Sequence, residues 1–319
     1  MLLAALEWCG RQGRWVLPIG LLCGVFLPWV AGPSRYLLTP CIWLLLCIAT
    51  VRLSRRGLAA EAITVSRRVS SVASLIVLVA CAQLALPVAV FYVASAVDLP
   101  EVWRMAATLV AAAPPISGSP SLVLLLRGDG ALALRWLVAG TALLPVTCLP
   151  ALLLLFSDHA PVALVWPAFK LLLLIASATL VGWLFNRVSQ LRGTYSSHEA
   201  LDGAAAITLA VMVVGLMSAL HAPDTHVGDL LTMLMLAIAV NVGLQIVGAS
   251  CAKTIKRPQA QTITAGVALG NRNVALYLTV LPASFIEPLL LFIACYQIPM
   301  YLTPLLGHFF YRRSGVSGA

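Results

Sequence analysis

The chain has 319 residues, of which 61% are hydrophobic and only 10% are charged, and its mean hydropathy is +0.99. The surface of a soluble domain of this size needs far more charge, so the composition excludes a soluble globular protein. It predicts an all-α polytopic membrane protein, because helices satisfy their own backbone hydrogen bonds inside a bilayer.

Apolar runs bounded by charged residues, proline or glycine predict ten transmembrane helices, each near the roughly 20 residues that a bilayer requires. In chain order the predicted spans are 15–31, 36–51, 70–97, 103–126, 131–156, 161–186, 203–221, 228–250, 262–284 and 287–310. The eight cysteines are scattered, mostly within apolar runs, and we interpret them as small apolar packing residues. No cofactor or metal is expected.

Basic residues gather in alternate connections between the predicted spans. One side receives sixteen of the 20 Lys and Arg residues, whereas the other receives only Arg35 and Arg104. Because cytoplasmic loops collect Lys and Arg, this bias predicts that both termini lie in the cytoplasm of a cell with a bacterial-type inner (plasma) membrane. The net charge of +9 is then a consequence of topology, and no nucleic-acid partner is expected.

Ten spans divide into two sets of five, 1–159 and 160–319. Because five is odd, the second set is inserted upside down relative to the first, as in transporters built from inverted repeats. The fourth span of each half contains helix-breaking residues, in the runs AAAPPISGSPSLV (111–123) and TITAGVALGNRNVA (262–275). Broken helices at matching positions of two halves indicate a transporter binding site.

Two broken helices of opposite orientation can cross near the bilayer midplane and direct their half-helix ends at a common site. The alternative is that the prolines only kink the helix and the serines bond back to the preceding turn. The predicted substrate-binding residues are Ser117, Ser119, Ser121, Asn271, Arg272, Asn273 and Lys170. Supporting polar residues, or a residual ion site, are Gln83, Thr141, Asn241, Thr262 and Thr264.

Arg272 and Lys170 are the two basic residues inside predicted spans. A charge at the bilayer centre costs at least about 2.5–3.5 kcal/mol on insertion scales. Arg272 is therefore either a structural cation satisfied by neighbouring carbonyls or a cation that binds an anion or replaces a bound ion. Lys170 either extends toward the external face or lines a transport cavity.

Two motifs resemble the bile acid:sodium symporter family. The run PPISGSPSLVLLLRGDGALAL (114–134) resembles its fourth-helix signature, in which Pro-Gly-Gly-Thr-Ala-Ser-Asn precedes Gly-Asp and Ala-Leu. The stretch 262–275 resembles its ninth-helix signature, Thr-x-Thr-x-Glu-x-Gly-x-Gln-Asn, with Thr262, Thr264 and Asn271 in step. The resemblance implies a panel domain of spans 1, 2, 6 and 7 and a core domain of spans 3–5 and 8–10. It also implies that the broken helices cross in the core and that substrates bind between the two domains.

The chain departs from the family at three sodium-binding positions. Gly266 stands where the family has Glu, Gly270 where it has Gln, and Pro120 where it has Asn. Hard cations need oxygen ligands, so we expect no sodium coupling of the family's kind. Arg272 follows the remaining Asn271, and its fixed charge is expected to replace part of a bound sodium ion.

The expected function is secondary transport of a small or amphipathic organic anion, a carboxylate or sulfonate, by alternating access. One alternative is a proton-coupled or uniport carrier of the auxin-efflux type, and another is a membrane receptor that transports nothing. The sequence has no HExxH, Walker loop or paired intramembrane carboxylates, so no enzyme is expected. Substrate identity, coupling ion, direction and oligomeric state stay open.

Overall fold

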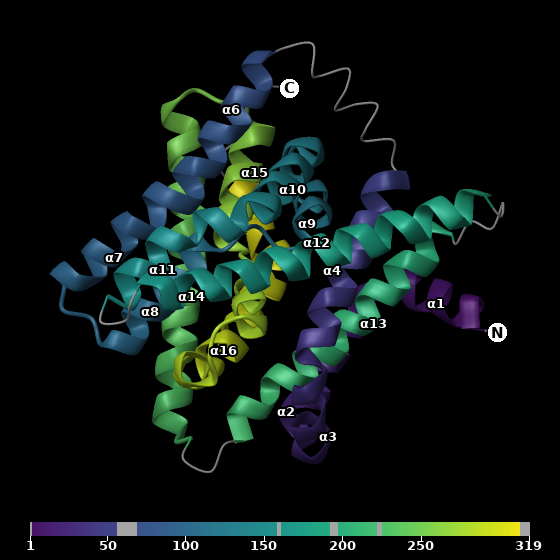
Figure 1. The fold of residues 1–319 in the computed structure, drawn as a ribbon, viewed down its shortest axis with the longest axis horizontal. Helices are drawn as coiled ribbons and strands as arrows, with labels where there is room; N and C mark the ends of the chain where they lie inside the picture. Colours follow the sequence, from purple (N-terminus) through teal and green to yellow (C-terminus); the bar gives the residue numbers. More distant parts are fainter. Residues whose placement is uncertain (1, 56–68, 158–160, 192–196, 222–224, 313–319) are drawn as a thin grey trace. The chain divides into compact units, whose positions relative to one another are not determined.

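The computed structural model of the chain describes residues 2–55, 69–157, 161–191, 197–221 and 225–312. Within these ranges the regular elements are helices (Figure 1). One isolated β-bridge pairs two of the segments between them. The prediction of an all-helical chain is therefore confirmed for this part. Met1 and 313–319 lie outside the described residues, and the placement of both termini in the cytoplasm stays a prediction.

Seven helical segments of the described chain are long and apolar enough to cross a membrane. They are Pro28–Arg52, Ala73–Ala96, Gly130–Thr147, Leu164–Leu191, Glu199–His221, Val227–Thr254 and Ala283–Pro304. This is the architecture of a multi-pass membrane protein. The predicted number of ten spans and the inverted repeats stay predictions.

The other three predicted spans are interrupted helices. The segment 15–31 is divided between α2 (Gly13–Phe26) and α3 (Pro28–Ser34), where Pro28 has no backbone N–H to continue the earlier helix. The segment 103–126 is divided between α8 (Glu101–Ala112) and α9 (Ser119–Leu125). In the segment 262–284, α15 (Gln259–Gly270) ends before the short helix η4 (Val274–Thr279).

The chain divides into two compact units. The first, here called unit one, comprises 1–72, 170–225 and 275–281, and the second, unit two, comprises 73–169, 226–274 and 282–319. Besides α2 and α3, unit one contains α1 (Leu2–Arg11), η1 (Arg35–Leu37), α4 (Leu38–Arg55), most of α12 (Pro161–Leu191), α13 (His198–Met217) and η3 (Ser218–His221).

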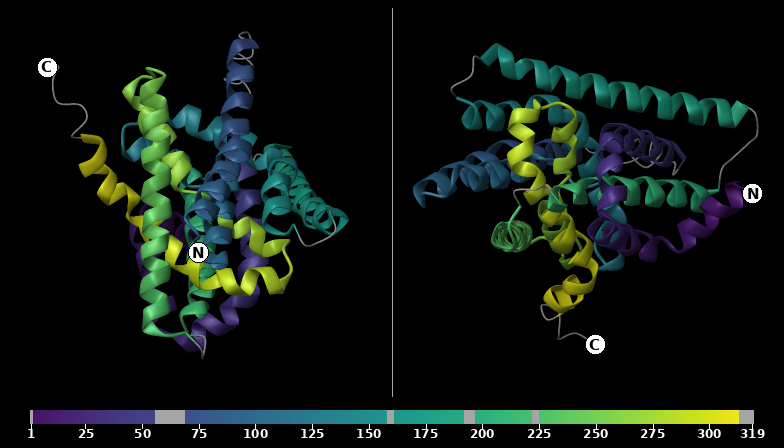
Figure 2. Two further views of the ribbon diagram at one scale, coloured as in Figure 1. Left: turned by 90° about the vertical axis from the view of Figure 1, so that its left-hand side faces the viewer. Right: turned by 90° about the horizontal axis from the view of Figure 1, so that it is seen from below.

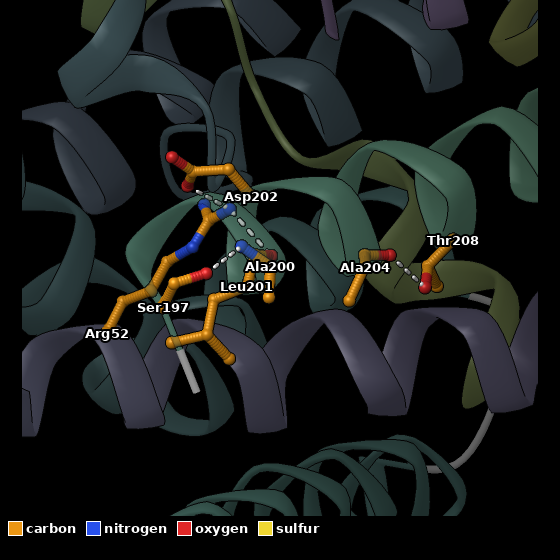
Figure 3. Close-up of polar contacts among 7 residues, drawn as sticks. All are labelled: Arg52, Ser197, Ala200, Leu201, Asp202, Ala204 and Thr208. Carbon is orange, nitrogen blue, oxygen red and sulfur yellow. Dashed lines mark hydrogen bonds and ion pairs between the residues drawn. The ribbon is translucent and has the colours of Figure 1, made fainter. Parts of the chain in front are cut away.

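Unit one is held together around α13. Glycines let other helices approach it closely: a Cβ built at Gly203 would overlap the Leu6 carbonyl of α1, and one at Gly20 would lie 2.9 Å from the Ala210 Cβ. At the start of α13, Arg52 of α4 pairs with Asp202 at 2.6 Å and donates to the Leu201 carbonyl (Figure 3). These contacts pack α1, α2 and α4 against α13, which is far from them in sequence.

Unit two contains α8, α9 and α15, and with them both helix breaks, at 113–118 and at 271–273. Its further elements are most of α6 (Val69–Ala80), the π-helical turn η2 (Cys81–Ala85), α7 (Leu86–Ala96), α10 (Gly130–Thr147), α11 (Leu149–Leu155), α14 (Val227–Thr254) and α16 (Ala283–Arg312). α14 is a straight, uninterrupted helix (green in Figure 2). α16 carries Pro288, Pro299 and Pro304 within its length. The candidate site lies in this unit.

Candidate functional site

The two helix breaks of unit two pair with each other as a short antiparallel bridge. The Ile116 N–H donates to the Asn271 carbonyl at 3.0 Å, and the Asn273 N–H donates to the Pro114 carbonyl at 2.8 Å. Pro115 and Arg272 form the central, non-hydrogen-bonded pair of this bridge. A proline fits there because its missing N–H is not needed. The breaks therefore satisfy each other's backbone groups, which is the condition for unwound chain at membrane depth.

The Arg272 side chain lies within this pairing and is only 1% exposed. Its guanidinium donates from Nε to the Leu269 carbonyl at 3.1 Å and from one terminal nitrogen to the Ala113 carbonyl at 2.7 Å. The other terminal nitrogen donates to the Ala82 carbonyl at 3.0 Å. Three backbone oxygens from three predicted spans thus converge on one positive charge.

Each of these carbonyls is left without its helical donor by a local feature of the sequence. Ala113 caps the C-terminal end of α8, and the prolines after it stop the helix. Ala82 lies in a turn whose hydrogen bonds join residues five apart, so its donor would be Pro87, which has no N–H. Leu269 would receive the Asn273 N–H in a continuous helix, but that group bonds across the break. Arg272 supplies the missing donors.

This geometry agrees with the first of the two alternatives for Arg272, a structural cation that neighbouring carbonyls satisfy. A ring of carbonyl oxygens is also the environment that a bound hard cation requires. The guanidinium therefore lies where backbone carbonyls favour a positive charge. That Arg272 also contacts the substrate stays a prediction.

A polar network surrounds the second break. Asn241 of α14 donates to the Gly270 carbonyl at 2.6 Å, and Gln245, one turn later, donates to the Asn241 Oδ1 at 2.7 Å. Gln245 also donates to Thr303 Oγ1 at 3.2 Å, and Thr303 donates to Asn271 Oδ1 at 3.0 Å. The predicted supporting residue Asn241 is therefore next to the break, together with the predicted Asn271.

The site prediction did not include Gln245, Thr303 or Tyr296, whose hydroxyl donates to the Gly270 carbonyl. Spacing could have found them. Asn241 and Gln245 are four residues apart on α14, and Tyr296 and Thr303 are seven apart on α16, so each pair shares one helix face. Polar residues on one face of an apolar span indicate contact with protein rather than lipid.

Gln83 is completely buried in η2. Its amide donates to the Gly140 carbonyl at 3.2 Å and accepts from Thr147 Oγ1 at 3.2 Å. The hydroxyl that bonds Gln83 belongs to Thr147 of α10. Thr141, the predicted supporting residue on the same helix, is half-buried, and its role stays a prediction. The two lie on different sides of a helix because six residues separate them.

The two predicted threonines of α15 are both buried. Thr262 Oγ1 lies 3.5 Å from the Arg257 carbonyl just before the helix. Thr264 Oγ1 donates to the Ala260 carbonyl at 2.8 Å and accepts the Asp129 N–H at 2.9 Å. Asp129 in turn caps α10, through a 2.9 Å bond from the Leu132 N–H. Thr264 therefore ties α15 to the turn after α9.

Replacing Thr264 by valine is expected to lower the free energy of unfolding by about 0.5–1.5 kcal/mol, because a buried hydrogen bond is lost at nearly constant volume. Replacement by serine keeps the hydroxyl and serves as the control. Thermal unfolding of the purified protein, followed by tryptophan fluorescence, measures both. Equal midpoints for the two variants would show that the Asp129 contact contributes nothing.

The remaining predicted residues are distributed unevenly. Ser117 and Asn273 lie in the paired breaks and are half-buried, whereas Ser119 is completely buried and Ser121 is exposed on α9. Lys170 is exposed on α12 and belongs to unit one. Unit two thus brings Ser117 together with Asn271, Arg272 and Asn273, while the role of Lys170 stays a prediction.

Among the described residues, no group of three or more His, Cys, Asp or Glu side chains is arranged to hold a metal ion. Comparison with protein-family models gives no match. A search of curated proteins likewise finds no similar sequence.

Proposed function

We propose that the chain is a secondary transporter of a small or amphipathic organic anion, such as a carboxylate or sulfonate, that works by alternating access. The observation that carries the proposal is the pairing of the breaks 113–118 and 271–273 around a buried guanidinium. Interrupted helices that meet inside a membrane unit are typical of transporter binding sites. A simple bundle of spans has no need of such a costly arrangement.

The proposed architecture is ten spans in two inverted repeats, 1–159 and 160–319. Two observations support it. The helix is interrupted in the fourth predicted span of each half. Unit one contains predicted spans 1, 2 and 7 and most of span 6, whereas unit two contains spans 4, 5, 8 and 10 and most of spans 3 and 9, which supports a panel and a core domain. The positive-inside bias supports cytoplasmic termini and the inner (plasma) membrane.

The proposed transport does not depend on sodium. The three carbonyls around Arg272 already face a permanent positive charge. A second cation in the same place would meet repulsion of several kcal/mol at short range. The proposed transporter therefore shares with the bile acid:sodium symporters the crossing breaks and the anion class, but not the coupling ion.

We assign the substrate to the half-buried polar groups of the breaks, Ser117 and Asn273. Hydrogen bonds to charged groups contribute about 1.5–3 kcal/mol. Alanine at Ser117 or Asn273 is therefore expected to weaken substrate binding about tenfold or more. Ser284→Ala, an exposed serine of unit two outside the breaks, is the matched control.

The test begins with a thermal-shift screen of the purified protein against carboxylates and sulfonates, in sodium chloride and in choline chloride, because ligands stabilise what they bind. Uptake of a stabilising anion into proteoliposomes follows. The expected result is saturable uptake that is equal in the two salts and reduced in Ser117→Ala and Asn273→Ala. If an anion binds but no flux occurs, the chain is a receptor, and the transport proposal is wrong.

The lack of sodium-binding side chains at Gly266 and Gly270 also favours the second candidate, a proton-coupled or uniport carrier of the auxin-efflux type. The same proteoliposomes separate these mechanisms. Uptake that is driven by an imposed pH gradient identifies proton coupling. Counterflow that proceeds equally with and without the gradient identifies a uniporter.

A further inference from the structure

A groove of about 260 Å³ lies between α14 and α16 of unit two. Apolar side chains such as Ile238, Val242, Ile246 and Leu302 form its walls. α16 also contributes Pro299 and Gly307 to the lining, and α14 contributes Ala249 and Ser250. Its volume is close to the lower end of ligand pockets, which begin at about 300 Å³.

The groove opens outward from membrane-crossing helices. Ile246 is 56% exposed and Leu302 is 41% exposed, so the rim faces the surroundings of the protein. Both helices belong to segments that are long and apolar enough to span a bilayer. The medium at this rim is therefore the acyl region of the membrane.

One end of the groove is positively charged. Lys253 lines it and is exposed near the end of α14, and Lys256 and Arg257 follow directly. Lys253 comes 15 residues after Ile238, which corresponds to about 22 Å along a helix. The groove is thus apolar along its length and carries a cation at one end. In the proposed topology this end lies on the cytoplasmic side, where anionic lipids are concentrated.

We propose that this groove binds one acyl chain of an anionic phospholipid, whose phosphate pairs with Lys253. Charge complementarity selects the head group, and the apolar walls of α14 and α16 select the chain. The site itself does not depend on what unit two transports.

The groove also lies next to the residues that hold the second helix break, so a bound lipid can affect that break. Its lining includes Gln245 and Thr303, which bond to Asn241 and Asn271. Tyr311, which also lines the groove, lies 3.4 Å from the Gln245 amide oxygen. A bound chain shields these hydrogen bonds from water and competing groups, so the lipid stabilises the arrangement of the second break.

The test uses the purified full chain titrated with dioleoyl-phosphatidylglycerol or dioleoyl-phosphatidylcholine in mixed detergent micelles. Bound lipid is counted by native mass spectrometry, and the unfolding midpoint is followed in parallel. The wild type is expected to retain one phosphatidylglycerol with at least fivefold preference over phosphatidylcholine. Equal retention of the two lipids overturns the proposal.

Two variants locate the site. Lys253→Gln removes the charge of an exposed side chain and is expected to abolish the preference, with Arg135→Gln on α10 as the control. Ala249→Phe fills the groove and is expected to remove both the bound lipid and its stabilisation, whereas Val247→Phe, outside the lining, keeps them. A preference for phosphatidylglycerol that survives Lys253→Gln, or lipid binding that survives Ala249→Phe, contradicts this site. If laurate stabilises the wild type and displaces phosphatidylglycerol, the groove is an entry for amphipathic carboxylates, and the lipid assignment is wrong.

Discussion

Replacing Arg272 by alanine is expected to destabilise unit two by several kcal/mol and to make its stability depend on sodium. The substitution removes the donors that satisfy the carbonyls of Ala82, Ala113 and Leu269. Each buried acceptor left without a partner costs about 1–3 kcal/mol. The carbonyls then surround an empty place that suits a small hard cation.

Thermal unfolding in sodium chloride, potassium chloride and choline chloride measures this effect. The wild type is expected to give one midpoint in all three salts. The Arg272→Ala variant is expected to have a lower midpoint in choline chloride that sodium partly restores. Arg135→Ala, which removes a guanidinium from α10, is the control and is expected to show neither change.

Lysine at position 272 separates charge from geometry. It keeps the positive charge but loses the planar fork that reaches several carbonyls at once. We expect a midpoint between those of the wild type and Arg272→Ala, without a response to sodium. A wild type that sodium stabilises, or an alanine variant that no cation stabilises, would contradict the view that Arg272 stands in for an ion.

The sequence predicted the breaks because their causes are local. Prolines at 114 and 115 remove backbone donors, and the run Gly270–Asn273 weakens a helix whatever surrounds it. It predicted helices elsewhere because apolar runs of this length have few alternatives in a bilayer. The same local logic missed the interruption at Pro28, since the apolar run there continues through the proline.

The partners of the site could not be predicted in this way. Ala82 and Arg272 are 190 residues apart, and the sequence around either residue does not indicate that they are in contact. The π-helical turn that frees the Ala82 carbonyl is marked in the sequence only by Pro87. Thr147 is the partner of Gln83 because helix rotation, and not residue type, decides which hydroxyl of α10 faces it. Tertiary packing sets these details.

Replacing Gly270 by alanine is expected to have the second largest effect on the protein. A Cβ at this position would overlap the Gln245 side chain and would lie 2.7 Å from the Asn241 backbone oxygen. The side chain can rotate away, but the α14 backbone cannot move without separating α14 from α15. Overpacking of this kind typically costs about 1–3 kcal/mol.

Gly243→Ala is the matched control, because it lies on α14 between Asn241 and Gln245 and a Cβ there meets no atom within 4 Å. It is expected to leave the free energy of unfolding unchanged or to raise it by up to about 1 kcal/mol, since alanine favours a helix interior. Unfolding midpoints and uptake rates of both variants measure the difference. If Gly270→Ala matches Gly243→Ala, the close approach of α14 to α15 is not needed.

The same packing leaves little room at positions 266 and 270 for the Glu and Gln side chains of the bile acid:sodium symporter pattern. Glutamine at 270 adds a larger side chain against the Asn241 backbone than alanine does, and glutamate at 266 begins from a Cβ that would overlap the Tyr311 hydroxyl and lie 3.1 Å from the Gln245 carbonyl. The Gly266→Glu, Gly270→Gln double variant is therefore expected to unfold below Gly270→Ala and to gain no stability from sodium. A double variant that folds and is stabilised by sodium would show that the helices have room for a cation site, and that Arg272 alone keeps it closed.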